Sequence, residues 1–104
     1  MQRLAFKMKL YKGYEQEYQK RHTEIWPQLQ DLLKELGISD YVIFLDETTN
    51  DLLGVLKAED PRILDALPQH PIMQQWWAYM SDIMESNPDN SPVQIPLKEV
   101  FYLP

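Results

Sequence analysis

Large apolar residues occupy every second position from residue 4 to residue 10, with Lys7 and Lys9 between them. Successive side chains of a strand point to opposite faces, so this alternation predicts a strand with one buried face. After Gly13 the apolar spacing changes to steps of three and four residues, which places side chains on one face of a helix. The predicted helical face contains Tyr14, Tyr18, His22, Ile25, Leu29, Leu32 and Leu36.

Pro27 divides this helical stretch. Because proline lacks an N–H and has a fixed φ, it suits the first turn of a helix and disrupts a helix interior. We therefore expect a break at Trp26-Pro27 and a second helix that ends at Gly37 as its C-cap. The face is aromatic and titratable before the break and aliphatic after it. An interior that is apolar at one end and able to hydrogen-bond at the other indicates a pocket.

Two β-rich segments follow at residues 41–45 and 52–56, and the polar residues between them predict a hairpin turn. Asp60 and Pro61 then predict a helix start, because an N-cap residue is followed by proline at the first helical position. Pro68 and Pro71 divide that helix into pieces. The piece after Pro71 carries two adjoining apolar stripes, formed by Met73, Trp77, Met80 and Met84 and by Ile72, Trp76, Tyr79 and Ile83.

The end of the chain completes a recognisable order of elements. Residues 87–92 all favour turns and predict a loop, and residues 97–103 predict a last strand. The resulting order, β-α-β-β-α-β, predicts one α+β domain over residues 1–104, with a ferredoxin-like βαββαβ antiparallel sheet and helices on one face. Val42 and Phe44 would lie on the other face, which is apolar and needs a cover. A second copy packed sheet to sheet provides one, so we expect a homodimer of the dimeric α/β-barrel kind.

Composition excludes several classes of function. The net charge is −6 and the chain contains no basic run, so a nucleic-acid partner is not expected. The absence of cysteine excludes disulfides, a thiolate nucleophile and a zinc-thiolate site. No apolar segment suits a signal peptide or a membrane span, which predicts a cytoplasmic protein with no membrane partner. No HExxH, GxGxxG, GxxxxGK[ST] or GxSxG motif occurs, and we predict neither a metal site nor a cofactor.

His22 is the only histidine on the predicted core-facing stripe, and imidazole exchanges protons near neutral pH. A structural histidine held by a hydrogen bond is the alternative. Tyr18 lies one turn earlier and Tyr41 lies on the next strand, so both phenols are candidates to bind a ligand or to orient the imidazole. The other histidine, His70, precedes a proline and is expected to be exposed. The acidic residues of the first helical segment, Glu15, Glu17, Asp31 and Glu35, are expected on its solvent side.

Trp76 and Trp77 differ by ~100° around a helix, so they cannot fill the same space. One or both should border a cavity, where an indole ring can contact the C–H face of a sugar while its N–H donates to a hydroxyl. The alternative is that both are core or dimer-interface residues.

The chain resembles the L-rhamnose mutarotase family over essentially its full length. The resemblance rests on a set of short segments in a fixed order. These segments are Tyr18 with Arg21-His22, Ile25-Trp26-Pro27, Tyr41, Trp76-Trp77 with Tyr79-Met80, Asn87-Pro88-Asp89-Asn90-Ser91-Pro92-Val93 and the C-terminal Glu99-Val100-Phe101-Tyr102-Leu103-Pro104.

The resemblance implies a dimeric, cofactor-independent isomerase that interconverts the α and β anomers of L-rhamnose. It also implies that His22 is the proton donor and that Tyr18, Tyr41, Trp76 and Trp77 bind the sugar. Two other interpretations stay open: a dimeric α/β-barrel monooxygenase, and a non-catalytic sugar-binding domain in which His22 is structural. We expect the loop at residues 87–92 to close over the pocket.

Overall fold

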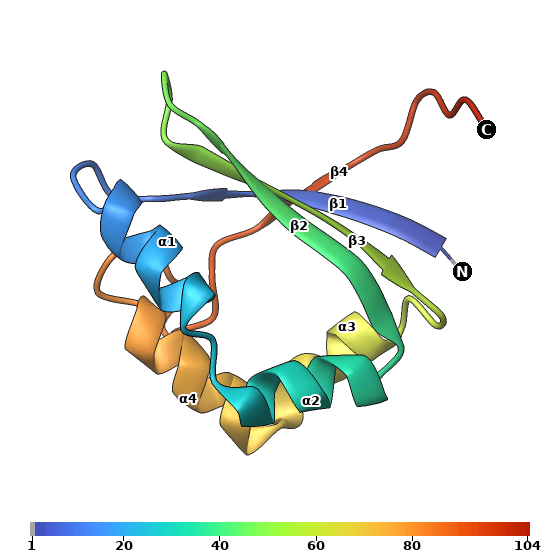
Figure 1. Cartoon of the computed structure of the whole chain (residues 1–104), viewed down its shortest axis with the longest axis horizontal. Coiled ribbons are helices and arrows are strands. Elements are labelled where there is room, and N and C mark those ends of the chain that lie inside the picture. The colour runs from blue at the N-terminus through green and yellow to red at the C-terminus, as the bar shows by residue number, and fades with distance from the viewer. Residues whose placement is uncertain (1) are drawn as a thin grey trace.

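Residues 2–104 are described by the structure, a computed structural model. Four strands form one antiparallel sheet in the order β2-β3-β1-β4, and the helices lie together on one of its faces (Figure 1). This is the predicted ferredoxin-like arrangement, so the α+β fold class is confirmed. The elements are β1 (Gln2–Lys9), α1 (Glu15–Thr23), α2 (Pro27–Glu35), β2 (Ile38–Asp46), β3 (Asp51–Ala58), α3 (Ile63–Ala66), the 3₁₀ turn η1 (Leu67–Gln69), α4 (Pro71–Met80) and β4 (Ile95–Leu97).

The breaks predicted from proline and glycine are confirmed. Trp26 has an extended backbone, as a residue before proline prefers, and it separates α1 from α2. The second helix ends at Glu35, and Gly37 follows with a φ of 82°, a left-handed conformation that glycine adopts at low cost. The break at Trp26 lets α1 and α2 point in different directions beneath the sheet (Figure 1), and the chain enters β2 after Gly37.

The helix predicted at Asp60-Pro61 begins later than expected. The Asp60 carboxylate accepts a 3.0 Å hydrogen bond from the Arg62 backbone N–H, which closes a turn, and the first helical residue is Ile63. Pro68 then lies in η1, and α4 begins at Pro71. The two prolines thus divide this region as predicted, but leave α3 only four residues long.

At the centre of the sheet, β1 pairs with β3, and Phe6 lies opposite Gly54. A Cβ atom at position 54 would lie 2.6 Å from the Phe6 ring. The ring therefore occupies the space that any larger residue would fill. The Phe6 ring also meets Tyr41 edge to face, with ring centroids 6.1 Å apart. Gly54 thus allows Phe6 to support the ring of Tyr41.

The prediction for the last strand was wrong over most of its length. β4 covers Ile95–Leu97, and the rest of the C-terminal segment has no sheet pairing. Arg3 holds this segment near β1 through a 3.1 Å ion pair with Glu99 and through its guanidinium, 4.6 Å from the centroid of the Tyr102 ring. The chain then points away from the sheet (Figure 1), and Phe101 is 77% exposed. The apolar pattern there marks exposed surface rather than a strand.

Candidate functional site

A cavity of about 640 Å³ lies between the helical layer and the inner face of the sheet. Its volume is in the range of small-molecule sites. A second hollow of about 350 Å³ adjoins it, because both are lined by Tyr41 and Trp77. All five residues predicted for the site line the larger cavity, namely Tyr18, His22, Tyr41, Trp76 and Trp77. The fold therefore brings together side chains from α1, β2 and α4.

His22 has a defined hydrogen-bonding state. Its Nδ1 atom lies 3.1 Å from the backbone carbonyl oxygen of Tyr18. Because a carbonyl oxygen only accepts, Nδ1 carries the proton and Nε2 of the neutral ring keeps a lone pair. Burial lowers the pKa of His22 below 6.5, although the carbonyl of Tyr18 opposes this shift. At neutral pH, His22 is therefore an uncharged acceptor at Nε2.

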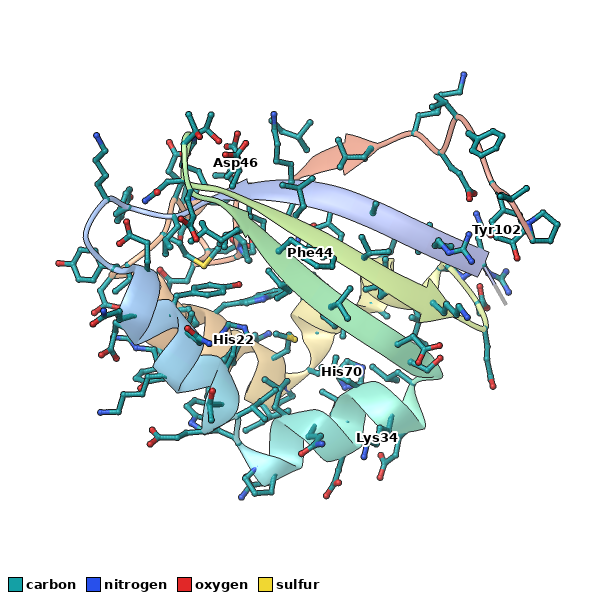
Figure 2. The ribbon with its side chains drawn as sticks, turned by 45° about the horizontal axis from the view of Figure 1, so that its top comes forward. His22, Lys34, Phe44, Asp46, His70 and Tyr102 are labelled. Carbon is teal, nitrogen blue, oxygen red and sulfur yellow. The ribbon has the colours of Figure 1, made fainter. Side chains whose placement is uncertain are left out.

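Two aromatic rings hold the imidazole in place. Tyr18 stacks on it with ring centroids 4.3 Å apart, and Trp76 meets it at 88° with a centroid separation of 5.5 Å. Figure 2 labels His22 on α1, on the side of the helical layer that is turned toward the sheet. These contacts from α1 and α4 restrict both the tilt and the position of the ring.

Tyr41 points into the cavity because it alternates with Val42, which lies on the outer face, and β2 is irregular just before it. Between the pairs Ser39↔Lys57 and Val42↔Val55, two residues of β2 stand opposite one residue of β3. Such a β-bulge redirects side chains, and Asp40 within it has a φ of 49°. The bulge therefore lets Ile38 line the same inner face as Tyr41, whose ring lies beside Phe6.

The two phenols are protonated donors at neutral pH. Burial raises the pKa of Tyr18 and of Tyr41 above the ordinary value of 10.0, and the neighbouring Tyr41 raises that of Tyr18 further. Tyr41 as a whole residue is partly exposed, so it is the inward placement of its hydroxyl that matters here. The cavity thus combines one proton acceptor with two hydroxyl donors.

The two tryptophans have different surroundings, as their divergence around the helix requires. Trp76 is buried, and its ring contacts Trp26 and Tyr79 at centroid distances of 5.1 and 5.7 Å as well as His22. Trp77 is half-buried and lines both hollows. Trp76 is therefore both a core residue and a wall of the cavity, whereas Trp77 has more free surface.

Sequence reasoning missed some neighbours of the site and misplaced others. Trp26 and Tyr79 stack on each other with centroids 5.6 Å apart, although the sequence patterns did not identify either as a neighbour of the site. Tyr14, expected on the buried face, is 43% exposed because it precedes the first residue of α1. Glu15 was expected in solvent but lines the cavity, where its Oε1 accepts a 3.4 Å hydrogen bond from Asn50. The position at which α1 begins thus decides whether these side chains face solvent or the cavity.

The loop at residues 87–92 lies at the cavity, as predicted, and Pro92 lines it. The backbone N–H of Asn87 donates to the Ser91 carbonyl at 2.7 Å, and its side-chain amide donates to Ser91 Oγ at 3.1 Å. The loop is therefore held by its own hydrogen bonds. Its closure over a ligand stays a prediction.

No group of three or more His, Cys, Asp or Glu residues within positions 2–104 is arranged to hold a metal ion. Across the same positions, every helix is too short or too polar to cross a bilayer.

Comparison with known proteins gave consistent matches along the whole chain. A sequence model of the family described as L-rhamnose mutarotase matches residues 3–103. An L-rhamnose mutarotase of Agrobacterium fabrum is 57% identical over 104 residues, which cover 100% of this chain and 97% of the relative. The corresponding protein of Brucella anthropi is 56% identical over 103 residues, or 99% and 97% of the two chains. The crystal structure of an L-rhamnose mutarotase from Formosa agariphila matches with a TM-score of 0.93, 51% identity and complete coverage of both chains.

Proposed function

The chain belongs to the L-rhamnose mutarotase family and is an isomerase, and from this premise we propose how its site works. We propose that it interconverts the α and β anomers of L-rhamnose in the cytoplasm without a cofactor, with His22 moving the proton. Tyr18, Tyr41, Trp76 and Trp77 bind the sugar. The relatives' names support this function over the monooxygenase and the non-catalytic alternatives.

The reaction requires two proton transfers, one from and one to the two oxygen atoms that are bonded to C1. In the ring form, C1 carries a hydroxyl oxygen, O1, and the ring oxygen, O5. Opening removes the proton from O1, forms the C1=O1 double bond, breaks the C1–O5 bond and adds a proton to O5. The aldehyde then rotates about C1–C2, and the reverse steps close the ring on its other face.

His22 has the properties that both movements need. Its neutral Nε2 takes the proton from O1, and the resulting imidazolium donates it to O5 as the C1–O5 bond breaks. Both oxygens are bonded to C1, so a single nitrogen atom is able to reach each of them. The Tyr18 carbonyl accepts from Nδ1–H and so favours the transient positive charge. His22 is thus the proton donor to the ring oxygen and is regenerated in each cycle.

The other residues bind and orient the sugar in this scheme. The hydroxyls of Tyr18 and Tyr41 donate hydrogen bonds to sugar oxygens, since their raised pKa values keep them protonated. The cavity-facing indoles of Trp76 and Trp77 contact the C–H faces of the ring. Weak contacts suit this role, because tight binding of either anomer stabilises the ground state and slows turnover.

The observation that carries the proposal is the free Nε2 of His22 in a cavity with two phenol donors. Saturation-difference proton NMR tests it: one anomeric proton of L-rhamnose is irradiated, and transfer to the other is followed with and without protein. We expect protein-dependent exchange, which His22→Gln reduces by about 10²–10⁴-fold. His70→Gln is the matched control, since His70 lines neither hollow. Full activity of His22→Gln would remove His22 from the mechanism.

We also propose that two copies pack through the outer face of the sheet. The strand registers place Val42, Val55, Ala5 and Leu97 in one row across all four strands. Phe44 lies on the same face and is 62% exposed. The helices cover the opposite face (Figure 1), and a bare apolar surface of this kind is typical of an interface. A second copy with the same row covers it symmetrically.

A further inference from the structure

Arg21 is half-buried although it is charged. Its side chain is only 10% exposed, and each of its guanidinium nitrogens has a partner. Nε donates to Glu17 Oε2 at 2.8 Å, within α1. Nη1 and Nη2 donate to the two carboxylate oxygens of Asp82, just beyond α4, at 2.9 and 3.3 Å. Nη1 also donates to the backbone carbonyl of Tyr79 at 2.8 Å. Arg21 therefore joins two helices that are separate in sequence.

The connection is made at the end of α4, where backbone carbonyls lack partners within the helix. Tyr79 lies in the last turn, so a cation there meets both a free carbonyl and the negative end of the helix dipole. The guanidinium also lies 4.3 Å from the centroid of the Tyr79 ring, which adds a cation–π contact. Arg21 thus holds both the backbone and the ring of Tyr79.

These contacts connect Arg21 to His22, the proposed proton-transfer residue. The Tyr79 ring packs on Trp76 with a centroid distance of 5.7 Å, and Trp76 in turn meets the imidazole of His22 at 5.5 Å. His22 follows Arg21 in α1. A chain of contacts therefore runs from Arg21 through Tyr79 and Trp76 to His22, the residue that follows Arg21 in the sequence.

Few backbone positions of α1 and α4 approach each other closely in the described part of the chain, so side chains make most of this connection. The distance between His22 and the indole wall consequently depends on a few side-chain contacts. We propose that Arg21 is a positioning residue that sets the separation and angle between His22 on α1 and Trp76 on α4. This inference rests on the proposed function of His22.

Arginine suits this task better than lysine. Its planar guanidinium donates in several fixed directions at once, so it binds the two Asp82 oxygens and the Tyr79 carbonyl together. Lysine keeps the charge but lacks the planar fork. Arg21→Lys therefore changes the geometry of the connection while it keeps the net charge of the protein.

The test compares Arg21→Lys with Arg62→Lys. Arg62 is a suitable control because it also pairs with an aspartate, at 2.9 Å from Asp60, but its side chain is 87% exposed and lines neither hollow. Since a misplacement of about 1 Å is able to cost ~10²-fold in rate, we expect Arg21→Lys to lower kcat by about 10–100-fold. KM for L-rhamnose should change by less than about threefold, because Trp76 is only one of the four proposed sugar-binding residues. Arg62→Lys should match the unchanged protein in both.

A second readout does not depend on activity. The C–H resonances of the His22 ring report the position of the Trp76 indole through its ring current, and the chain has only two histidines to assign. We expect these resonances to move in Arg21→Lys and to stay unchanged in Arg62→Lys. Both measurements are made well below the melting temperature of each variant, so a loss of stability does not mimic the effect. Unchanged resonances with unchanged kcat per folded molecule would overturn the role of Arg21. Absent exchange in the unaltered protein would instead overturn the proposed function.

Discussion

The Nδ1 atom of His22 donates its hydrogen to the carbonyl oxygen of Tyr18 over 3.1 Å, one helical turn away. This bond is made within α1 and needs no ligand. It keeps the proton on Nδ1, so that the unprotonated Nε2 faces the cavity. The same residue that stacks on the ring through its phenol thus also selects its tautomer through its backbone.

The pH dependence of the activity follows from this state. Burial lowers the pKa of His22 below 6.5, and the neutral ring is the form that accepts the O1 proton. We therefore expect activity to be constant at neutral pH and to decline only below pH 6.5, as the ring becomes protonated. The measurement is the rate of anomer exchange against pH, corrected for exchange without protein. A rate that instead declines as the pH rises through neutrality would show that the resting ring carries the donated proton.

The two phenols should contribute separately measurable hydrogen bonds. We expect Tyr18→Phe and Tyr41→Phe each to lower kcat/KM by about tenfold, the equivalent of one lost hydrogen bond. Tyr11→Phe is the control, because Tyr11 is outside both hollows. The double variant Tyr18→Phe with Tyr41→Phe should lose less than the product of the two effects, since the hydroxyls are neighbours. Fully independent effects would argue against a shared sugar site.

Gly54 should be required for stability because of Phe6. The methyl group of Gly54→Ala would lie 2.6 Å from the Phe6 ring, so we expect a loss of about 1–3 kcal/mol in the free energy of unfolding. Urea denaturation measures it. In a Phe6→Leu background the same substitution should cost clearly less, because the ring is gone. An equal cost in both backgrounds would mean that strand geometry, not the ring, requires glycine.

Phe44 tests the proposed dimer. An aspartate on the apolar outer face would be buried without a partner in a sheet-to-sheet interface, which is strongly unfavourable. We expect the unchanged protein to sediment as a dimer and Phe44→Asp as a monomer in analytical ultracentrifugation. Tyr11→Asp adds the same charge away from this face and should leave the dimer intact. A monomeric unchanged protein, or a dimeric Phe44→Asp, would contradict the proposal.

Local signals in the sequence were sufficient for most of the elements. The period of two in β1, the break at Pro27 and the stop at Gly37 each depend on the chemistry of a few adjacent residues. The placement of Tyr18 and His22 on one face of α1 also follows from helix geometry alone. For this reason the fold class and the inward placement of Tyr18 and His22 could be predicted from sequence, whereas the family resemblance singled out Tyr41, Trp76 and Trp77 with them.

Only the tertiary structure decided the rest, because it depends on contacts between distant segments. The bulge in β2, and the burial of Trp76 rather than Trp77, result from strand register and helix docking. β4 ends at Leu97 although β1 continues to Gln2, because the chain leaves the sheet there, which the apolar pattern of the C-terminus does not reveal. Arg21 reaches Asp82 across 61 positions of sequence. A residue pattern encodes which face is buried, but the partner that a buried charge finds is determined only when the helices meet.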